Sequence, residues 1–277
     1  MLKHRLGIVG GGMFFGFCIL AIIGPWIVPA DYNTINLDHR HASPSWMDQD
    51  NGMGLLGTDG IGRDIFTGII LGARISMFIG ITVTLLNVIL ATGPGLVAAY
   101  YGGWVDDVIM RISDMNAALP PLVLLLAVMA FLGQGVMNLI IFFGISAALS
   151  AGRVTRGEVF RAKNMEYVMA AKAIGCKDIR IMIRHIFPNV TAPLIIGLTL
   201  GFGGIILAEA GLSYLGFGAN PDEPSWGRML SDARESITFA WAPSIAPGVA
   251  IVLVVLAGNL FGDWLRDTLD PRLRGRR

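Results

Sequence analysis

The stretch from Arg153 to Pro188, RVTRGEVFRAKNMEYVMAAKAIGCKDIRIMIRHIFP, is a charged island that lies between two apolar runs. The flanking runs, Gly135–Ala151 and Val190–Phe217, are apolar enough to lie in lipid. The island must therefore project from a membrane surface. It is rich in Lys and Arg, which are concentrated on the cytoplasmic side of membrane proteins. We therefore expect the island to be a cytoplasmic element.

The sequence of the island predicts two short helices that meet at a tight elbow. Asn164 is expected to cap a helix from Met165 to Ile174, and Gly175 is expected to end it, because a residue without a Cβ readily adopts the left-handed conformation. Asp178 is expected to cap the second helix, and Pro188 to end it. Four apolar residues of the second helix fall at helical spacing on one face, namely Ile179, Met182, Ile183 and Ile186.

The first of these helices carries two adjacent alanines, Ala170 and Ala171, which present almost no side chain. Another protein could therefore approach the helix backbone closely. Lys163, Lys172 and Lys177 lie nearby in the sequence and would attract acidic groups of such a partner. The island is thus predicted to be a docking element.

The order of these small residues resembles a known family. Ala170-Ala171, three further residues, Gly175 and then Phe187-Pro188 are similar to the cytoplasmic loop of the inner-membrane subunits of bacterial ABC importers. In that family the loop forms a coupling helix that sits in a groove of the ATPase. Three positions depart from the family pattern, which usually has Glu at 169, an aliphatic residue at 185 and Leu at 187. The resemblance implies ATPase-coupling roles for Met169, Ala170, Ala171, Gly175, His185, Phe187 and Pro188.

Composition places the whole chain in a membrane. Hydrophobic residues make up 54% of the 277 residues, charged residues only 15%, and the mean hydropathy is +0.63. A soluble domain of this length would have about a quarter of its residues charged. The two cysteines, Cys18 and Cys176, lie in an apolar run and at the elbow, so neither a disulfide framework nor a metal cluster is expected. The predicted fold class is an all-α polytopic membrane protein.

Six membrane spans are expected, with both termini in the cytoplasm. The third and fourth are short for full spans and could instead form a re-entrant pair, which leaves the island on the same side. With this topology all but five of the 21 Lys and Arg residues lie inside, and the five are Arg40, Arg63, Arg74, Arg228 and Arg234. The spans are expected at Leu6–Val28, Ile75–Tyr100, Ala117–Leu132, Gly135–Ala151, Val190–Phe217 and Ala242–Leu260.

Further motifs narrow the resemblance to the second, C-type permease of dipeptide, oligopeptide and nickel importers. They are GTDGIGRD (57–64), GARIS (72–76), LSYLGFG (212–218), PSWG (224–227) and GDWLRDTLDPR (262–272). The resemblance implies the type I ABC importer permease fold, with a coupling helix between spans 4 and 5. It divides the chain into residues 1–67, a first helix with a periplasmic segment, and a core permease domain of residues 68–277 with the coupling loop at 153–188. From the residues alone, GTDG predicts a turn in which Asp59 and Asp64 serve Arg63 or backbone donors.

Partners follow from the resemblance. It implies a second homologous permease subunit, two ATP-binding subunits, and a periplasmic or lipid-anchored substrate-binding protein, with no nucleic acid. This sequence contains no Walker A loop, so ATP and Mg²⁺ are expected on partner subunits, and neither a cofactor, a metal nor an enzyme activity is expected of this chain. The expected location is the bacterial inner membrane, and the expected cargo is a di- or oligopeptide, with nickel or another small solute as the alternative.

An acid inside a predicted span, Glu209, is a candidate functional residue, because a carboxylate at membrane depth faces protein or water rather than lipid. It could brace the helices by hydrogen bonding, or it could handle substrate or protons. The second reading leaves open a different class of protein, a self-sufficient proton-coupled transporter. The candidates for pore or gate residues are Glu209, Asn87 and Tyr214.

Overall fold

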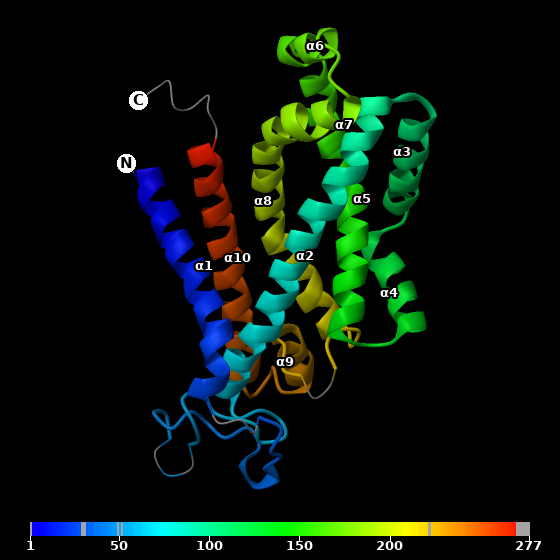
Figure 1. The fold of residues 1–277 in the computed structure, drawn as a ribbon. Coiled ribbons are helices and arrows are strands. Elements are labelled where there is room, and N and C mark those ends of the chain that lie inside the picture. Colours follow the sequence, from blue (N-terminus) through cyan, green and yellow to red (C-terminus); the bar gives the residue numbers. More distant parts are fainter. Residues whose placement is uncertain (1, 29–31, 49, 51, 221–222, 270–277) are drawn as a thin grey trace. The chain divides into compact units, whose positions relative to one another are not determined.

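The computed structural model describes residues 2–28, 32–48, 50, 52–220 and 223–269, and within these the regular secondary structure is helical, apart from one isolated β-bridge between Thr58 and Asp64. The predicted basic tail, Arg272, Arg274, Arg276 and Arg277, lies outside the described residues. The helices (Figure 1) are α1 (Leu2–Ile27), η1 (Leu37–His39), α2 (Ile65–Tyr101), α3 (Gly103–Ala118), α4 (Pro121–Leu132), α5 (Val136–Lys163), α6 (Glu166–Ala173), α7 (Asp178–Ile181), η2 (Met182–Ile186), α8 (Phe187–Tyr214), α9 (Trp226–Asp232), η3 (Ala233–Glu235) and α10 (Ala242–Leu269).

Five stretches of the described chain are long and apolar enough to cross a membrane. A sixth span exists if α3 and α4, which are bent by 91° at their break, count as one. The all-helical, polytopic class predicted from composition is therefore confirmed. The five stretches are Leu6–Ile27, Ile65–Tyr101, Val136–Lys163, Asp178–Gly197 and Ala242–Thr268.

Several predicted boundaries were wrong. Helix α2 begins at Ile65, ten residues before the predicted span, so GARIS lies inside the helix rather than before it. The short run Gly135–Ala151 is part of the 28-residue α5, which continues to Lys163 and so includes the first third of the charged island. Charge marks where a helix leaves the membrane, whereas the helix itself continues as long as its backbone hydrogen bonds do.

The chain forms two compact units. The first comprises residues 1–82, 129–140 and 202–261, and its core lies among α1, the first half of α2, α9, α10 and the second half of α8. Helices α1 and α10 lie side by side in it: the rings of Phe14 and Phe261 stack at 5.2 Å, and a Cβ added at Gly10 would lie 2.3 Å from the Cβ of Leu260. Met77, Ile206 and Trp226 are buried at its centre.

The second unit comprises residues 83–128, 141–201 and 262–277. Its core joins the end of α2, α5, α6, α7, η2 and the start of α8 through buried side chains that include Tyr100, Val159, Val168 and Ile181. Helices α2 and α5 approach closely at Gly95, where a Cβ would lie 2.6 Å from the Cβ of Thr155. The elbow is thus part of a packed core and not a free loop. The division of the chain at residue 67 stays a prediction.

A π-turn carries the chain through the proline that was predicted to end the second island helix. Helices α7, η2 and α8 follow one another without a break, and the N–H of Phe187 donates to the carbonyl of Met182, five residues back. Pro188 is the second residue of α8 and follows the π-turn directly. The wider π-turn shifts the hydrogen-bond register, so the proline ring is accommodated and the helix continues into the membrane.

Candidate functional site

The first helix of the elbow, α6, ends as predicted but begins differently. Gly175 has φ +78°, the N–H of Cys176 donates to the carbonyl of Ala171, and the N–H of Gly175 donates to that of Lys172. These two bonds form a Schellman motif, so glycine is required there by the left-handed backbone. The capping residue at the other end is Met165, without a side-chain hydrogen bond, and Asn164 donates instead to the carbonyl of Phe160. The predicted Asn164 cap was therefore wrong.

The second helix, α7, also lacks its predicted cap. Asp178 is the first residue of the helix, and its Oδ1 accepts a hydrogen bond from the hydroxyl of Tyr100 at 2.5 Å. The carboxylate of Asp178 thus hydrogen-bonds the end of α2 and does not cap the backbone of its own helix. This contact could not be predicted from the sequence, because the two residues are 78 positions apart.

Tyr100 is the centre of this contact. The ammonium groups of Lys163 and Lys172 lie over its ring, at 5.6 Å and 5.3 Å from the ring centroid. Lys163 also donates to the carbonyls of Tyr100, at 2.5 Å, and Ala99, at 3.3 Å. These are among the last carbonyls of α2, which have no partner within the helix, and a positive charge is favourable at a helix C-terminus. The end of α2 is therefore joined to α5, α6 and α7 through one tyrosine.

The elbow has an inward and an outward side. Val168 and Ala171, three residues apart on α6, are buried with Ile181, Met182 and Ile186. Ala171, only 5% exposed, is therefore part of the protein's own core, and the prediction that it lies open to a partner was wrong. Ala170 is exposed, as predicted for a docking surface.

Several large apolar side chains point outward instead. Ile174, just before Gly175, is 80% exposed. Ile179 and Ile183 are exposed as well, so the predicted apolar face of the second helix is divided, because only Met182 and Ile186 of its four residues turn inward. Of the remaining coupling candidates, Met169, Gly175, Phe187 and Pro188 are exposed and His185 is half-buried. We call the outward set the elbow residues, defined as Met169, Ala170, Ile174, Ile179 and Ile183.

Glu209 of α8 lies in the first unit, where it is 1% exposed. Its Oε1 accepts a hydrogen bond from Ser213 Oγ at 2.7 Å, and its Oε2 accepts one from Ser76 Oγ of α2 at 3.3 Å. The hydroxyl of Ser225 also hydrogen-bonds the carboxyl group. Because burial of an unpaired carboxylate is very costly, these hydroxyls account for how Glu209 is tolerated. They also join α8, α2 and the start of α9.

The PSWG motif explains why α9 approaches so closely. Ser225 is the N-cap of α9 and accepts from the N–H of Arg228, so its own O–H remains for Glu209. The buried indole of Trp226 donates to the carbonyl of Ile69 at 3.0 Å. At Gly227 a Cβ would lie 2.5 Å from the carbonyl oxygen of Ala210, so only glycine fits. Each residue from 225 to 227 thus attaches α9 to a membrane helix.

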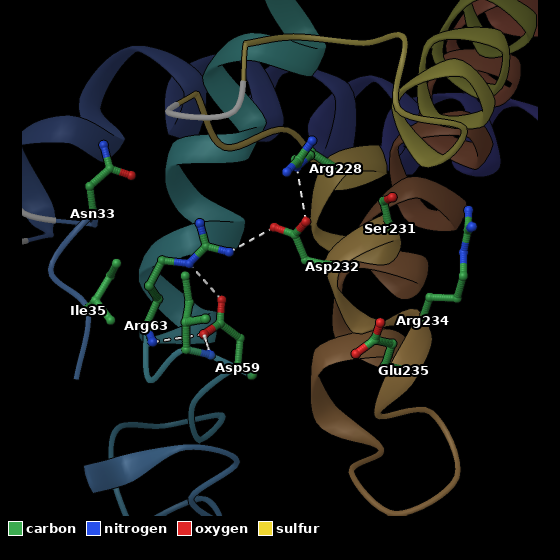
Figure 2. A pocket seen from close by; sticks show the side chains of 11 residues that line it. Asn33, Ile35, Asp59, Arg63, Arg228, Ser231, Asp232, Arg234 and Glu235 are labelled. Carbon is green, nitrogen blue, oxygen red and sulfur yellow. Dashed lines mark hydrogen bonds and ion pairs between the residues drawn. The ribbon is translucent and has the colours of Figure 1, made fainter. Parts of the chain in front are cut away.

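An ion network ties the GTDGIGRD turn to α9. Figure 2 shows Arg63 between Asp59 and Asp232: its Nε donates to Asp59 at 2.7 Å and its NH2 group to Asp232 at 2.8 Å. Arg228 lies on the other side of Asp232, at 3.0 Å. Burial acts to lower the pKa of Arg63, but Tyr32 and the two carboxylates raise it above its ordinary value, so the guanidinium stays charged. The predicted turn and its Asp59–Arg63 pair are confirmed.

Tyr214 and Asn87, the other two pore or gate candidates, are not among the residues that hydrogen-bond Glu209. Tyr214 lies five residues after Glu209, but its ring is covered by the guanidinium of Arg234, at 4.3 Å from the ring centroid. Asn87 belongs to the second unit, where its side chain is buried and its Oδ1 has no hydrogen-bond partner among the described residues. Sequence reasoning missed Tyr100, Ser225 and Trp226, although the PSWG motif was a signal for the last two.

Long apolar helices joined by charged connections, with a packed elbow at one of them, define the class of polytopic membrane proteins. Comparison with known proteins makes this specific: residues 91–275 match the family of binding-protein-dependent transport system inner membrane components, and residues 1–44 match the N-terminal TM domain of oligopeptide transport permease C. The chain belongs to this family of ABC transporter permeases. It is a multi-pass inner-membrane component, and ATP hydrolysis belongs to a separate subunit.

Curated relatives cover almost the whole chain. It is 42% identical to the dipeptide transport system permease protein DppC of Alkalihalophilus pseudofirmus, over 98% of this chain and 88% of the relative. It is 39% identical to the di/tripeptide transport system permease protein DppC of Pseudomonas aeruginosa, over 98% and 90%. It is 36% identical to the glutathione transport system permease protein GsiD of Pectobacterium atrosepticum, over 99% and 89%. The predicted resemblance to C-type permeases is confirmed.

The hydroxyl cluster predicts that Glu209 is replaceable by glutamine but not by alanine. In Glu209→Gln the amide can accept from and donate to the same serine hydroxyls, so thermal stability and ATP-driven uptake should remain close to wild type. Glu209→Ala leaves the hydroxyls unsatisfied and should lower the free energy of unfolding by about 2 kcal/mol. Thermal unfolding and uptake by the reconstituted complex check both; loss of uptake in a stable Glu209→Gln protein would contradict a bracing role.

The position of Tyr100 predicts that its hydroxyl is needed for coupling. Tyr100→Phe keeps the ring beneath Lys163 and Lys172 but removes the bond to Asp178. The complex should assemble and hydrolyse ATP, while uptake per ATP hydrolysed falls at least about tenfold, because a hydrogen bond to a charged group contributes about 1.5–3 kcal/mol. The control is Tyr101→Phe, whose neighbouring exposed ring makes no such bond. Equal uptake per ATP in both variants would show that the hydroxyl has no part in coupling.

Proposed function

We propose that this chain forms one half of the translocation path of an ATP-driven importer for di- or oligopeptides. A second homologous permease forms the other half, and two ATP-binding subunits dock at the cytoplasmic side, where both termini of this chain lie. A periplasmic or lipid-anchored binding protein delivers the cargo from the opposite side. The family membership supports a binding protein and an ATPase as partners, and the asymmetric distribution of Lys and Arg supports the orientation.

The coupling role rests on one observation: the elbow has a buried inward side and an outward side with exposed apolar side chains. Large apolar side chains such as Ile174 and Ile179 are exposed on a connection that is otherwise charged. Each fully exposed isoleucine or methionine forgoes about 1.5–3 kcal/mol of burial, so their exposure next to a rigid, packed inner side favours a protein partner that covers them. We therefore assign ATPase contact to the elbow residues, with Phe187 and Pro188 beside them, and a supporting role to Ala171, Gly175 and His185.

Transmission would follow from the same packing. When ATP binding draws the two ATPase subunits together, the elbow moves with them. Because Tyr100, Lys163 and Asp178 join the elbow to the end of α2, that helix is carried along as a rigid body. As the helices alternate between two arrangements, the translocation path opens to the outer side. Asn87 is our candidate for a residue that faces this path, since its amide oxygen is unsatisfied within the described chain, whereas the contacts of Glu209 and Tyr214 favour bracing.

The names of the relatives favour a peptide as the cargo. Two of them are dipeptide or di/tripeptide permeases, and the third is a glutathione permease. Glutathione is itself a tripeptide, so all three names agree on a short peptide. We propose dipeptides first and glutathione second, in preference to nickel.

The docking role predicts a selective effect of a charge at the elbow. Ile174→Asp places a carboxylate where the ATPase would cover an apolar side chain, and because Ile174 is exposed the permease should fold normally. Retention of the ATPase during purification should fall by about tenfold, which corresponds to about 1.4 kcal/mol. Ile237→Asp, at a comparably exposed isoleucine of the first unit, is the control. If both variants retain the ATPase equally, the elbow is not the docking surface.

The cargo assignment predicts the outcome of an uptake assay in proteoliposomes that contain the complete complex and its binding protein. Labelled dipeptide should accumulate only with ATP inside, and unlabelled dipeptides should compete more strongly than glutathione or Ni²⁺. A pH gradient without ATP should drive no uptake. Accumulation by this chain alone in response to a pH gradient would instead favour a proton-coupled transporter, and stronger competition by glutathione would reverse the order of the two cargoes.

A further inference from the structure

A groove runs between α1 and the first half of α2, within the first compact unit. The groove is open to the outside and has a volume of about 610 Å³. Its wall carries one charged side chain, Arg74, and one amphipathic ring, Trp26. The other lining residues are small, apolar or uncharged, namely Cys18, Ala21, Ile22, Pro25, Met77, Phe78, Ile81 and Thr82. The GARIS motif therefore places an arginine in an otherwise uncharged groove.

Arg74 has no partner of its own among the described residues: none of them forms a hydrogen bond, an ion pair or a ring contact with it. The Arg74 side chain is exposed on the surface of this chain. Neighbouring arginines of the same unit differ in this respect, since Arg63, Arg228 and Arg234 all contact an acid, a carbonyl or a ring. An unpaired guanidinium on a membrane helix calls for an anion from outside the chain.

The length of α2 places Arg74 near the edge of the hydrocarbon. The helix has 37 residues, which at 1.5 Å per residue is about 55 Å, against about 30 Å of bilayer hydrocarbon. If the excess is divided between the two ends, about eight residues project at each. Arg74, nine residues after Ile65, then lies at the boundary between hydrocarbon and headgroups.

Trp26, on α1, indicates the same depth of the groove in the membrane. It is the last residue but one of α1, it lines the same groove, and it is 79% exposed. Tryptophan is enriched at the level of lipid headgroups, because its ring is apolar and its N–H is polar. Two side chains on two helices thus independently mark the groove as interfacial, with the apolar residues Ile22, Phe78 and Ile81 continuing toward the membrane interior.

We propose that the α1–α2 groove binds one anionic phospholipid, with its phosphate on Arg74 and an acyl chain along Ile22, Phe78 and Ile81. The guanidinium supplies charge-assisted hydrogen bonds to phosphate oxygens. No acid lines the groove that could pair with the ammonium group of phosphatidylethanolamine, so phosphatidylglycerol is the preferred headgroup. The inference needs only that the chain spans a membrane, and it does not depend on the cargo or on the ATPase contact.

The test counts lipids on the purified, complete complex by native mass spectrometry. Delipidated complex is titrated with phosphatidylglycerol, phosphatidylcholine or glycerol 1-phosphate. The wild type should retain one phosphatidylglycerol more per permease than Arg74→Leu, a change that suits a lipid-facing helix and preserves folding. Arg74→Lys should keep this lipid with weaker retention. Arg111→Leu, at an exposed arginine of α3 in the other unit, should lose none.

Fluorescence then locates the lipid. Phosphatidylglycerol with brominated acyl chains should quench Trp26, measured as the difference between the wild type and Trp26→Phe, and Arg74→Leu should abolish that difference. Equal lipid retention in the wild type and Arg74→Leu would overturn the proposal. So would equal binding of glycerol 1-phosphate, which would indicate a phosphate site without a lipid. Loss of the second permease from Arg74→Leu in place of lipid would show that the groove belongs to a protein partner.

Discussion

The carbonyls at the end of a membrane helix need hydrogen-bond donors, and in this protein a lysine from another helix supplies them. Lys163 binds the carbonyls of Ala99 and Tyr100, and the Tyr100 hydroxyl binds Asp178 at the start of α7. The polar groups that close α2 are therefore the same groups that hold the elbow. Without them the elbow would be a charged loop, and the ATPase contact that we propose for it could not move a helix. We regard this joint as the feature on which coupling depends.

The first unit uses the same principle for a different purpose. The carboxyl of Glu209 and the hydroxyls of Ser76, Ser213 and Ser225 satisfy one another where water is scarce, and the result is a firm connection between α9 and two membrane helices. Such groups are costly to bury singly and stabilising as a closed set. Outside the membrane segment, Arg63 and its carboxylate partners extend the connection to the GTDGIGRD turn. A segment that is mostly loop is thereby fixed to α9.

Much of this arrangement could be predicted from the sequence, and the reasons are physical. Apolar runs long enough for a bilayer indicate spans, the glycine after Ile174 indicates a left-handed helix end, and an acid at membrane depth indicates a polar cluster. These features depend on neighbouring residues in the chain.

The side-chain partners were not predictable in the same way. Asp178 could have capped its own helix, and it binds Tyr100 only because α2 approaches it in the fold. Likewise Ala170 and Ala171 look equivalent in sequence, and only the packing of α6 makes one a surface residue and the other a core residue. Charge and proline do not locate the helix ends here, because α5 continues past Arg153 and a π-turn accommodates Pro188.

Coupling through this joint requires that the elbow and the end of α2 move as one body. Spin labels on Val97 of α2 and Lys177 at the elbow, both exposed and both in the second unit, measure it directly after Cys18 and Cys176 are replaced by alanine. In the assembled transporter, pulsed electron spin resonance should give one narrow distance that is the same with and without bound ATP. A distance that shifts or splits when ATP binds would show that the elbow moves independently of α2, and would contradict the account.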